Sequence, residues 1–307
     1  MKDNASLVGG KVLLRQINDR VLIVQMLVMV FLCINLLLIS MFFKNESFYT
    51  TTRYILFAVN LLSDSFLLVV SDILLILVFF NLTFQVWLCV IICFVLIVYT
   101  TVTPVTLTAM TLERYVAVCM PLRHGELCST RNTINCILII HALSSVPSIF
   151  IFSTFFGSAS LKFYTKYQLC SVEIFILFRW QDNLRSAVYQ IFFLIMCIII
   201  VFCYVKIMKV AKAASGKDKR SSRKGLRTVA LHGFQLLLCL IRLWCPFIEA
   251  AIFAINVKLF IDVRYINYIM FNLAPKCLSP LVYGLWDETF SHALKKNVFC
   301  GFFRRNI

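Results

Sequence analysis

The chain has 307 residues, of which 61% are hydrophobic and only 14% are charged, and its mean hydropathy is +0.89. A soluble domain is about half apolar and about a quarter charged, so this composition excludes a water-soluble globular protein. In such a chain the net charge of +16 is better explained by basic cytoplasmic loops than by nucleic-acid binding.

Seven long apolar runs follow one another along the chain. Each exceeds the roughly 20 residues that cross a bilayer as a helix, and helices satisfy their own backbone groups in lipid. The runs are 21–43, 53–80, 86–118, 133–156, 184–210, 229–256 and 259–284. The sequence therefore predicts an all-α membrane protein: an N-terminal segment at 1–20, a seven-transmembrane helix bundle at 21–284, and a short amphipathic eighth helix with a tail at 285–307.

The N-terminal segment is polar and lacks the apolar core of a cleavable signal peptide. Asn4 opens an Asn-Ala-Ser glycosylation sequon, which is used only outside the cytoplasm. Lys and Arg are more numerous on the inner segments if the N-terminus lies outside, although four basic residues before the first run oppose this. We expect a multi-pass plasma-membrane protein with an extracellular N-terminus and a glycan on Asn4.

The third run ends with Glu113-Arg114-Tyr115 inside the stretch MTLERYVAVC. A guanidinium at the membrane edge needs a partner, and the adjacent carboxylate of Glu113 can supply one. The stretch resembles the MAYDRYVAIC signature of odorant receptors, and its central triplet is shared by rhodopsin-like G-protein-coupled receptors. The resemblance implies that Arg114 leaves Glu113 on activation and helps to form the cleft for the G protein.

Two further stretches extend the resemblance. The stretch 224–233 partly matches KAFSTCASHL of odorant receptors, at Lys224, Thr228, Ala230 and His232. Trp244 and Pro246 resemble the C-W-x-P hinge of the wider class, where the proline kinks the sixth helix. The departures from the odorant-receptor pattern suggest a divergent branch, the fish-type odorant receptors.

The last run is similar to the P-x-x-L-N-P-x-x-Y pattern of the class, with Ser279 in place of Asn, followed by Pro280 and Tyr283. Tyr283 and Tyr204 match the two tyrosines that meet near the arginine in active receptors. The resemblance also implies a disulfide between Cys89, at the outer end of the third helix, and Cys170 in the second outer loop. Cys93, one turn deeper, is the rival of Cys89.

A polar core is expected at mid-membrane, where a charge is costly without a partner. Asn35 and Asp64 are spaced like the Asn and Asp of the first two helices of the class, where many members bind sodium. We expect the Lys276 ammonium to replace that ion and to pair with Asp64, with Thr103 and Ser279 nearby. For Arg242, in the sixth run, the sequence suggests no partner, because Glu249 is two turns away.

The resemblance places a ligand site in the outer halves of the third, fifth, sixth and seventh helices. The residues that map to it are Leu96, Ile97, Thr100, Val188, Phe192, Phe247, Ile248, Ala251, Ile269 and Leu273. Most are apolar, as in small-molecule sites, although each could equally belong to the packed core. Amine receptors carry Asp at the position of Leu96, and opsins carry the retinal lysine at the position of Leu273. A biogenic amine and a Schiff-base chromophore are therefore not expected.

The sequence therefore predicts a receptor for a small-molecule odorant that activates a heterotrimeric G protein of the olfactory stimulatory type. The bilayer is its other partner, and neither a cofactor, a metal nor nucleic acid is implied. A rhodopsin-like receptor for an internal ligand (peptide, lipid or nucleotide) is the alternative, favoured somewhat by Trp244. A transporter or channel would predict internal repeats, and no enzyme motif is present.

Overall fold

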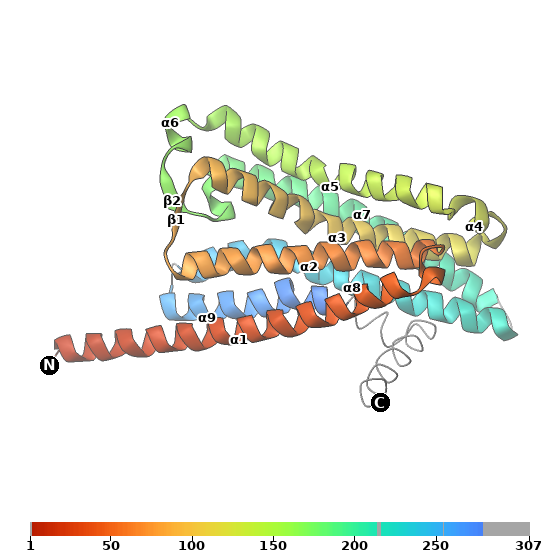
Figure 1. Cartoon of the computed structure of the whole chain (residues 1–307), viewed down its shortest axis with the longest axis horizontal. Helices are drawn as coiled ribbons and strands as arrows, with labels where there is room; N and C mark the ends of the chain where they lie inside the picture. The colour runs from red at the N-terminus through yellow and green to blue at the C-terminus, as the bar shows by residue number, and fades with distance from the viewer. Residues whose placement is uncertain (1, 214–215, 254, 279–307) are drawn as a thin grey trace.

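A computed structural model of the chain describes residues 2–213, 216–253 and 255–278, and it is almost entirely helical (Figure 1). Within the described residues, seven long helical segments coincide with the seven apolar runs. They are α1 (Lys2–Lys44), α2 (Thr52–Phe79), α3 (Val86–Cys119), α5 (Thr130–Ser158), α7 (Arg179–Ala213), α8 (Gly216–Phe253), and α9 (Val257–Asn267), which continues into the π-helical turn η3 (Tyr268–Leu273). The predicted all-α class is confirmed.

Short elements connect the long helices. They are η1 (Glu46–Phe48), β1 (Thr83–Gln85), α4 (Pro121–Leu127), α6 (Leu161–Tyr164), β2 (Tyr167–Leu169) and η2 (Val172–Phe175). The first helix begins at Lys2, so the N-terminal segment is continuous with the first span and extends beyond the bundle in Figure 1. The expected eighth helix, Ser279, Pro280 and Tyr283 lie outside the described residues.

The long helices are suited to a bilayer. Within the described ranges, five of them are long and apolar enough to cross it, and α8 is a sixth if its two parts, Leu226–Arg242 and Phe247–Phe253, form one bent span. Only 28% of the most apolar window of α7 is buried inside the bundle, and 39% of that of α3. Most of the apolar surface therefore faces outward, where lipid replaces water as the solvent.

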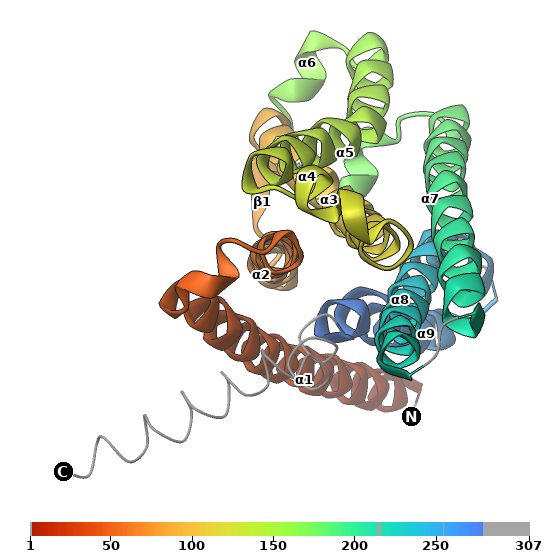
Figure 2. The ribbon, with the colours of Figure 1, turned by 90° about the vertical axis from the view of Figure 1, so that its right-hand side faces the viewer.

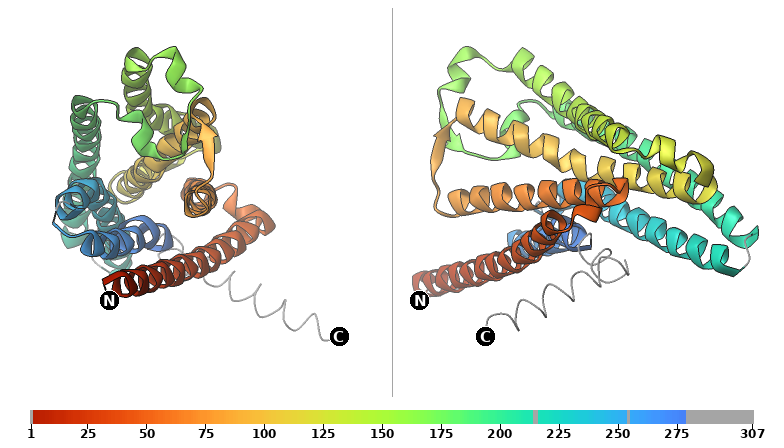
Figure 3. Two further views of the ribbon diagram at one scale, coloured as in Figure 1. Left: turned by 90° about the vertical axis from the view of Figure 1, so that its left-hand side faces the viewer. Right: turned by 45° about the vertical axis from the view of Figure 1, so that its right-hand side comes forward.

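The bundle is built around α3, which packs against α2, α5, α7 and α8. Seen end-on, α1 and α5 lie on opposite sides of the bundle, with α2 and α3 between them (Figures 2 and 3). The main core is a cluster that includes Leu61, Val102, Ile200 and Leu236 from four of these helices.

The two ends of the bundle differ. At one end, which we call the disulfide end, β1 pairs antiparallel with β2, with Phe84 opposite Gln168. The side chain of Arg20 in α1 pairs there with Asp262 of α9. The other end, which we call the Arg114 end, carries η1 and α4 (Figure 1).

Candidate functional site

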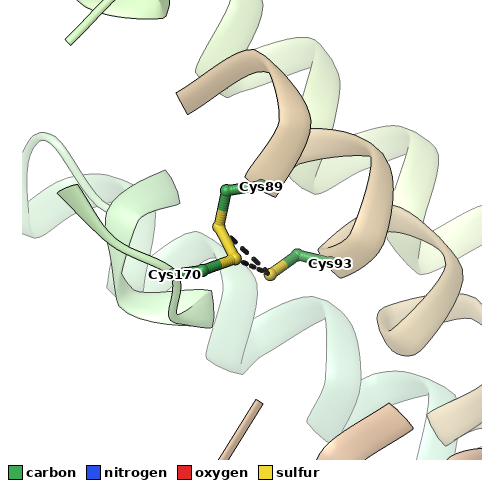
Figure 4. A group of neighbouring side chains, drawn as sticks. All are labelled: Cys89, Cys93 and Cys170. Atoms are coloured by element: carbon green, nitrogen blue, oxygen red, sulfur yellow. Dashed lines mark hydrogen bonds between the residues drawn. A yellow bond between two sulfur atoms is a disulfide. The ribbon is translucent and has the colours of Figure 1, made fainter. Parts of the chain in front are cut away.

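A disulfide joins Cys89 in α3 to Cys170, which directly follows β2. Cys93 lies one helical turn from Cys89, and its sulfur is 3.8 Å from that of Cys89 and 3.9 Å from that of Cys170 (Figure 4). All three cysteines are buried. The disulfide that the resemblance implied, Cys89–Cys170, is therefore present, and the sulfur of Cys93 contacts both of its sulfurs.

The disulfide holds the loop between α5 and α7 over the end of the bundle. The buried side chain of Gln181 also fixes this loop: its oxygen accepts from the backbone N–H groups of Leu177 and Phe178, at 2.8 and 3.1 Å. Its nitrogen donates to the Thr154 carbonyl and the Ser158 hydroxyl of α5, at 3.2 and 3.1 Å. The loop is therefore tied to α3 covalently and to α5 by hydrogen bonds.

Beneath this loop lies a cavity of about 270 Å³ between α3, α5, α7 and α8. The loop itself contributes Val172 to its wall. The other lining residues are Leu96, Ile97, Thr100, Thr101, Ile151, Arg185, Ser186, Tyr189, Gln190, Phe193, Cys239, Arg242 and Phe247. The mixture of apolar walls and a few polar groups is typical of a small-molecule site.

Four of the ten expected ligand contacts line this cavity: Leu96, Ile97, Thr100 and Phe247. The others lie elsewhere. Val188 lines a separate narrow crevice beside α5, and Phe192 packs against the main core. Ile248 and Ala251 are exposed on α8.

The last two expected contacts, Ile269 and Leu273, pack in a cluster with Val24, Val28 and Leu68 of α1 and α2. The seventh helical segment therefore contributes no residue to the wall of this cavity, because the side chains of Ile269 and Leu273 face α1 and α2.

Sequence reasoning missed the charged residues of the cavity. Arg185 of α7 and Arg242 of α8 both line it, and both lie near the partly buried Tyr189. Arg185 donates to Asp182 at 2.7 Å. Arg242 forms no ion pair or hydrogen bond with any residue in the described part of the chain. The only sequence signal for it was a charge inside an apolar run without an evident partner.

The α8 helix bends by 40° between Leu226–Arg242 and Phe247–Phe253, and Pro246 falls in the bend. The side chain of Trp244 is 51% exposed and contacts the ring of Phe247, with 6.3 Å between the ring centroids. The expected hinge tryptophan therefore lies outside the cavity. Arg242 and Phe247 occupy the cavity wall on the two sides of the bend instead.

At the Arg114 end, the Glu113 carboxylate is shared. Arg114 Nε lies 3.7 Å from Glu113 Oε2, and His124 Nε2 of α4 lies 3.3 Å from Glu113 Oε1. The arginine contact is too long for a hydrogen bond. The contact between His124 and Glu113 was not predicted from the sequence. The two residues are 11 positions apart, and only the turn into α4 brings their side chains together.

The remaining residues of this end connect α3 to its neighbours. The ring of Tyr115 contacts Phe202 of α7, with 5.7 Å between centroids, and Tyr204 packs against the main core. Thr111 Oγ1 of α3 lies 3.3 Å from Nδ1 of the buried His232 of α8. This last contact joins α3 to α8 beside Arg114.

The polar core differs from the expected direct pair. The buried Asp64 accepts from Thr103 Oγ1 at 2.8 Å and from Asn60 Nδ2 at 3.0 Å. The Lys276 ammonium donates to Asn272 at 3.2 Å, and it interacts with Asp64 electrostatically without a direct contact. Asn35 is buried and has no hydrogen-bond partner within the described residues.

Comparison with known proteins gives a consistent match. The family model described as "7 transmembrane receptor (rhodopsin family)" matches residues 34–283. The chain is 42% identical over 300 residues to odorant receptor 131-2 of Danio rerio, covering 98% of this chain and 92% of that protein. It is 27% identical over 216 residues to galanin receptor 2a of Danio rerio, covering 66% and 56%. It is 23% identical over 207 residues to melatonin receptor type 1B of Mus musculus, covering 62% and 52%.

Proposed function

Because the chain belongs to the rhodopsin family of seven-transmembrane receptors, we propose that it is an odorant-activated receptor coupled to a heterotrimeric G protein. The ligand binds in the cavity beneath the loop, and the G protein binds at the Arg114 end. The chain is a receptor and not an enzyme, as its family membership indicates.

The observation that carries the proposal is the 270 Å³ cavity between α3, α5, α7 and α8. Its volume is close to the lower limit of small-molecule sites, about 300 Å³. The identity of 42% over nearly the whole chain to an odorant receptor favours an odorant over an internal ligand.

The disulfide supports one orientation of the bundle in the membrane. Disulfides form on the oxidising side of a membrane, so the end that carries Cys89–Cys170 is extracellular. The N-terminus lies at the same end as this disulfide (Figure 1), so the N-terminal segment with Asn4 is extracellular with it. The Arg114 end is then cytoplasmic, at the plasma membrane.

The bend of α8 gives a mechanism for coupling the two ends. A ligand that contacts both Arg242 and Phe247 touches both sides of the bend, so it favours one bend angle over another. A change of that angle moves the part of α8 that carries His232 and separates it from Thr111 of α3. Arg114, held to Glu113 only at 3.7 Å, is then available to the G protein.

A functional assay tests the proposal. Cells that co-express the chain and an olfactory stimulatory G protein are challenged with a broad odorant panel, and cyclic AMP is measured. We expect a response in the wild type and its loss in Arg114→Ala at matched surface level. Arg179→Ala, at an exposed position at the start of α7 and away from the Arg114 end, is the matched control and retains the response.

A response of equal size in Arg114→Ala contradicts the proposed coupling site. Silence of the wild type at confirmed surface expression contradicts odorant activation and favours the second candidate, a receptor for an internal ligand. The partial matches to galanin and melatonin receptors are the observations that support that candidate.

A further inference from the structure

We infer that the ligand is a small carboxylic acid with an apolar body, and that Arg242 binds its carboxylate. This inference rests on the proposed function, because it assigns a chemical class to the ligand of the same cavity. It starts from the charges of the cavity wall and from the partners of those charges.

The wall of the cavity is positively charged. Its lining contains two arginines, Arg185 and Arg242, and neither Asp nor Glu. The charge of Arg185 is offset by Asp182, at 2.7 Å. Arg242 has no such partner among the described residues, so it is the unneutralised charge of the wall.

Neither Glu249 nor Asp64 forms an ion pair with Arg242, and both carboxylates accept hydrogen bonds from other residues. Glu249, on the same helix, accepts from Asn267 Nδ2 at 3.0 Å. Asp64 accepts from Thr103 and Asn60. An arginine between membrane helices is costly without an anion, so an anion that enters the cavity removes this cost.

The geometry of a guanidinium selects the kind of anion. Its planar fork of donors matches a carboxylate with two parallel hydrogen bonds, and such charge-assisted bonds are about twice as strong as neutral ones. An amine is repelled by the same charge. An amino acid is disfavoured as well, because its ammonium finds no acidic partner among the lining residues.

The apolar residues of the cavity wall indicate the nature of the uncharged part of the ligand. Leu96, Ile97, Phe193 and Phe247 offer apolar surface from three helices. A cavity of about 270 Å³ lies near the lower end of the range for small-molecule sites. The cavity therefore suits an acid with one aromatic ring or a short alkyl chain.

A matched series of ligands tests this class. The four probes share one carbon skeleton and differ in their polar groups: 3-phenylpropanoate, 3-phenylpropanol, 3-phenylpropylamine and phenylalanine. Binding to the purified full-length receptor is measured as thermal stabilisation, which does not depend on the G protein. We expect 3-phenylpropanoate to raise the melting temperature, and the other three to have little effect at the same concentration.

The variant Arg242→Gln tests the anchor. We expect the affinity for 3-phenylpropanoate to fall about 10- to 100-fold, as for the loss of hydrogen bonds to a charged group. Arg242→Lys keeps the charge without the fork and shows a smaller loss. Arg179→Gln, at an exposed position of α7 outside the cavity, is the matched control and binds like the wild type. The melting temperature without ligand shows whether each variant is folded.

Three results would overturn the inference. The first is no stabilisation by 3-phenylpropanoate up to about 1 mM, the weak end of specific binding. The second is equal stabilisation by the alcohol or the amine, and the third is unchanged affinity in Arg242→Gln. The cyclic AMP assay separates the two proposals. Activation by odorants that carry no acid overturns this inference and leaves the proposed function. Binding of the acid without any G-protein response sustains this inference and contradicts the proposed function.

Discussion

Single residues in this receptor are governed by the need to satisfy polar groups inside an apolar environment. Asp64 uses Thr103 and Asn60, and Gln181 uses four groups of the loop and α5. Arg242 lacks such a partner within the described chain, and we propose that a ligand supplies it.

The cluster of three sulfurs leads to a prediction for Cys93. In Cys89→Ala, we expect Cys170 to form a disulfide with Cys93, because the two sulfurs are already 3.9 Å apart and have only about 2 Å to close. Mass spectrometry of non-reduced peptides identifies the crosslink. In Cys89→Ala/Cys93→Ala the Cys170 thiol stays free, and a free Cys170 thiol in the single variant would contradict the prediction.

Elements are positioned by contacts that the local sequence does not reveal. The loop between α5 and α7 closes the cavity because β2 pairs with β1, Cys170 bonds to α3, and Gln181 fixes the turn into α7. The cavity thus depends on the loop as a unit, and Val172 reaches the wall only through these attachments.

We predict that Gln181→Leu destabilises the receptor by about 1–3 kcal/mol, because it removes the four hydrogen bonds that the buried Gln181 side chain makes with the loop and α5. Ligand affinity should fall with it, since the loop covers the cavity. Thermal unfolding of the purified receptor measures the change. Gln168→Leu in β2 is the control, since that side chain makes none of these contacts; equal stability of both variants would refute the prediction.

At the scale of the whole molecule, the surrounding lipid determines which apolar residues contribute to the stability of the helix bundle. The surface of α7 shows the contrast: Ile198 is 61% exposed and Ile200 is 5% exposed, although both are isoleucines of one helix. Lipid tails solvate Ile198 as well as a protein core would, so helix association depends on close packing and not on apolar burial.

We therefore expect Ile200→Ala to destabilise the receptor by about 2 kcal/mol, the low end for such truncations, because it opens a cavity in the main core beside α8. Ile198→Ala should be close to neutral in a bilayer. Thermal unfolding in lipid nanodiscs compares the two, and a larger loss for Ile198→Ala would show that α7 faces the bundle with the opposite side.

The sequence by itself determined the class of protein, the helical segments and the Glu113-Arg114 pair, because apolar run length and short motifs are local properties. The disulfide was implied only by the family resemblance, with Cys93 as the rival of Cys89, and the structure bonds Cys89. It named four residues of the cavity wall but assigned Ile269 and Leu273 to it as well. Only the tertiary structure decided which helix faces meet, since the rotation of each helix is set by packing against its neighbours. That packing placed Arg185 and Arg242 in one cavity, turned Trp244 outward, and gave Asp64 hydrogen bonds from Thr103 and Asn60 without a direct contact to Lys276.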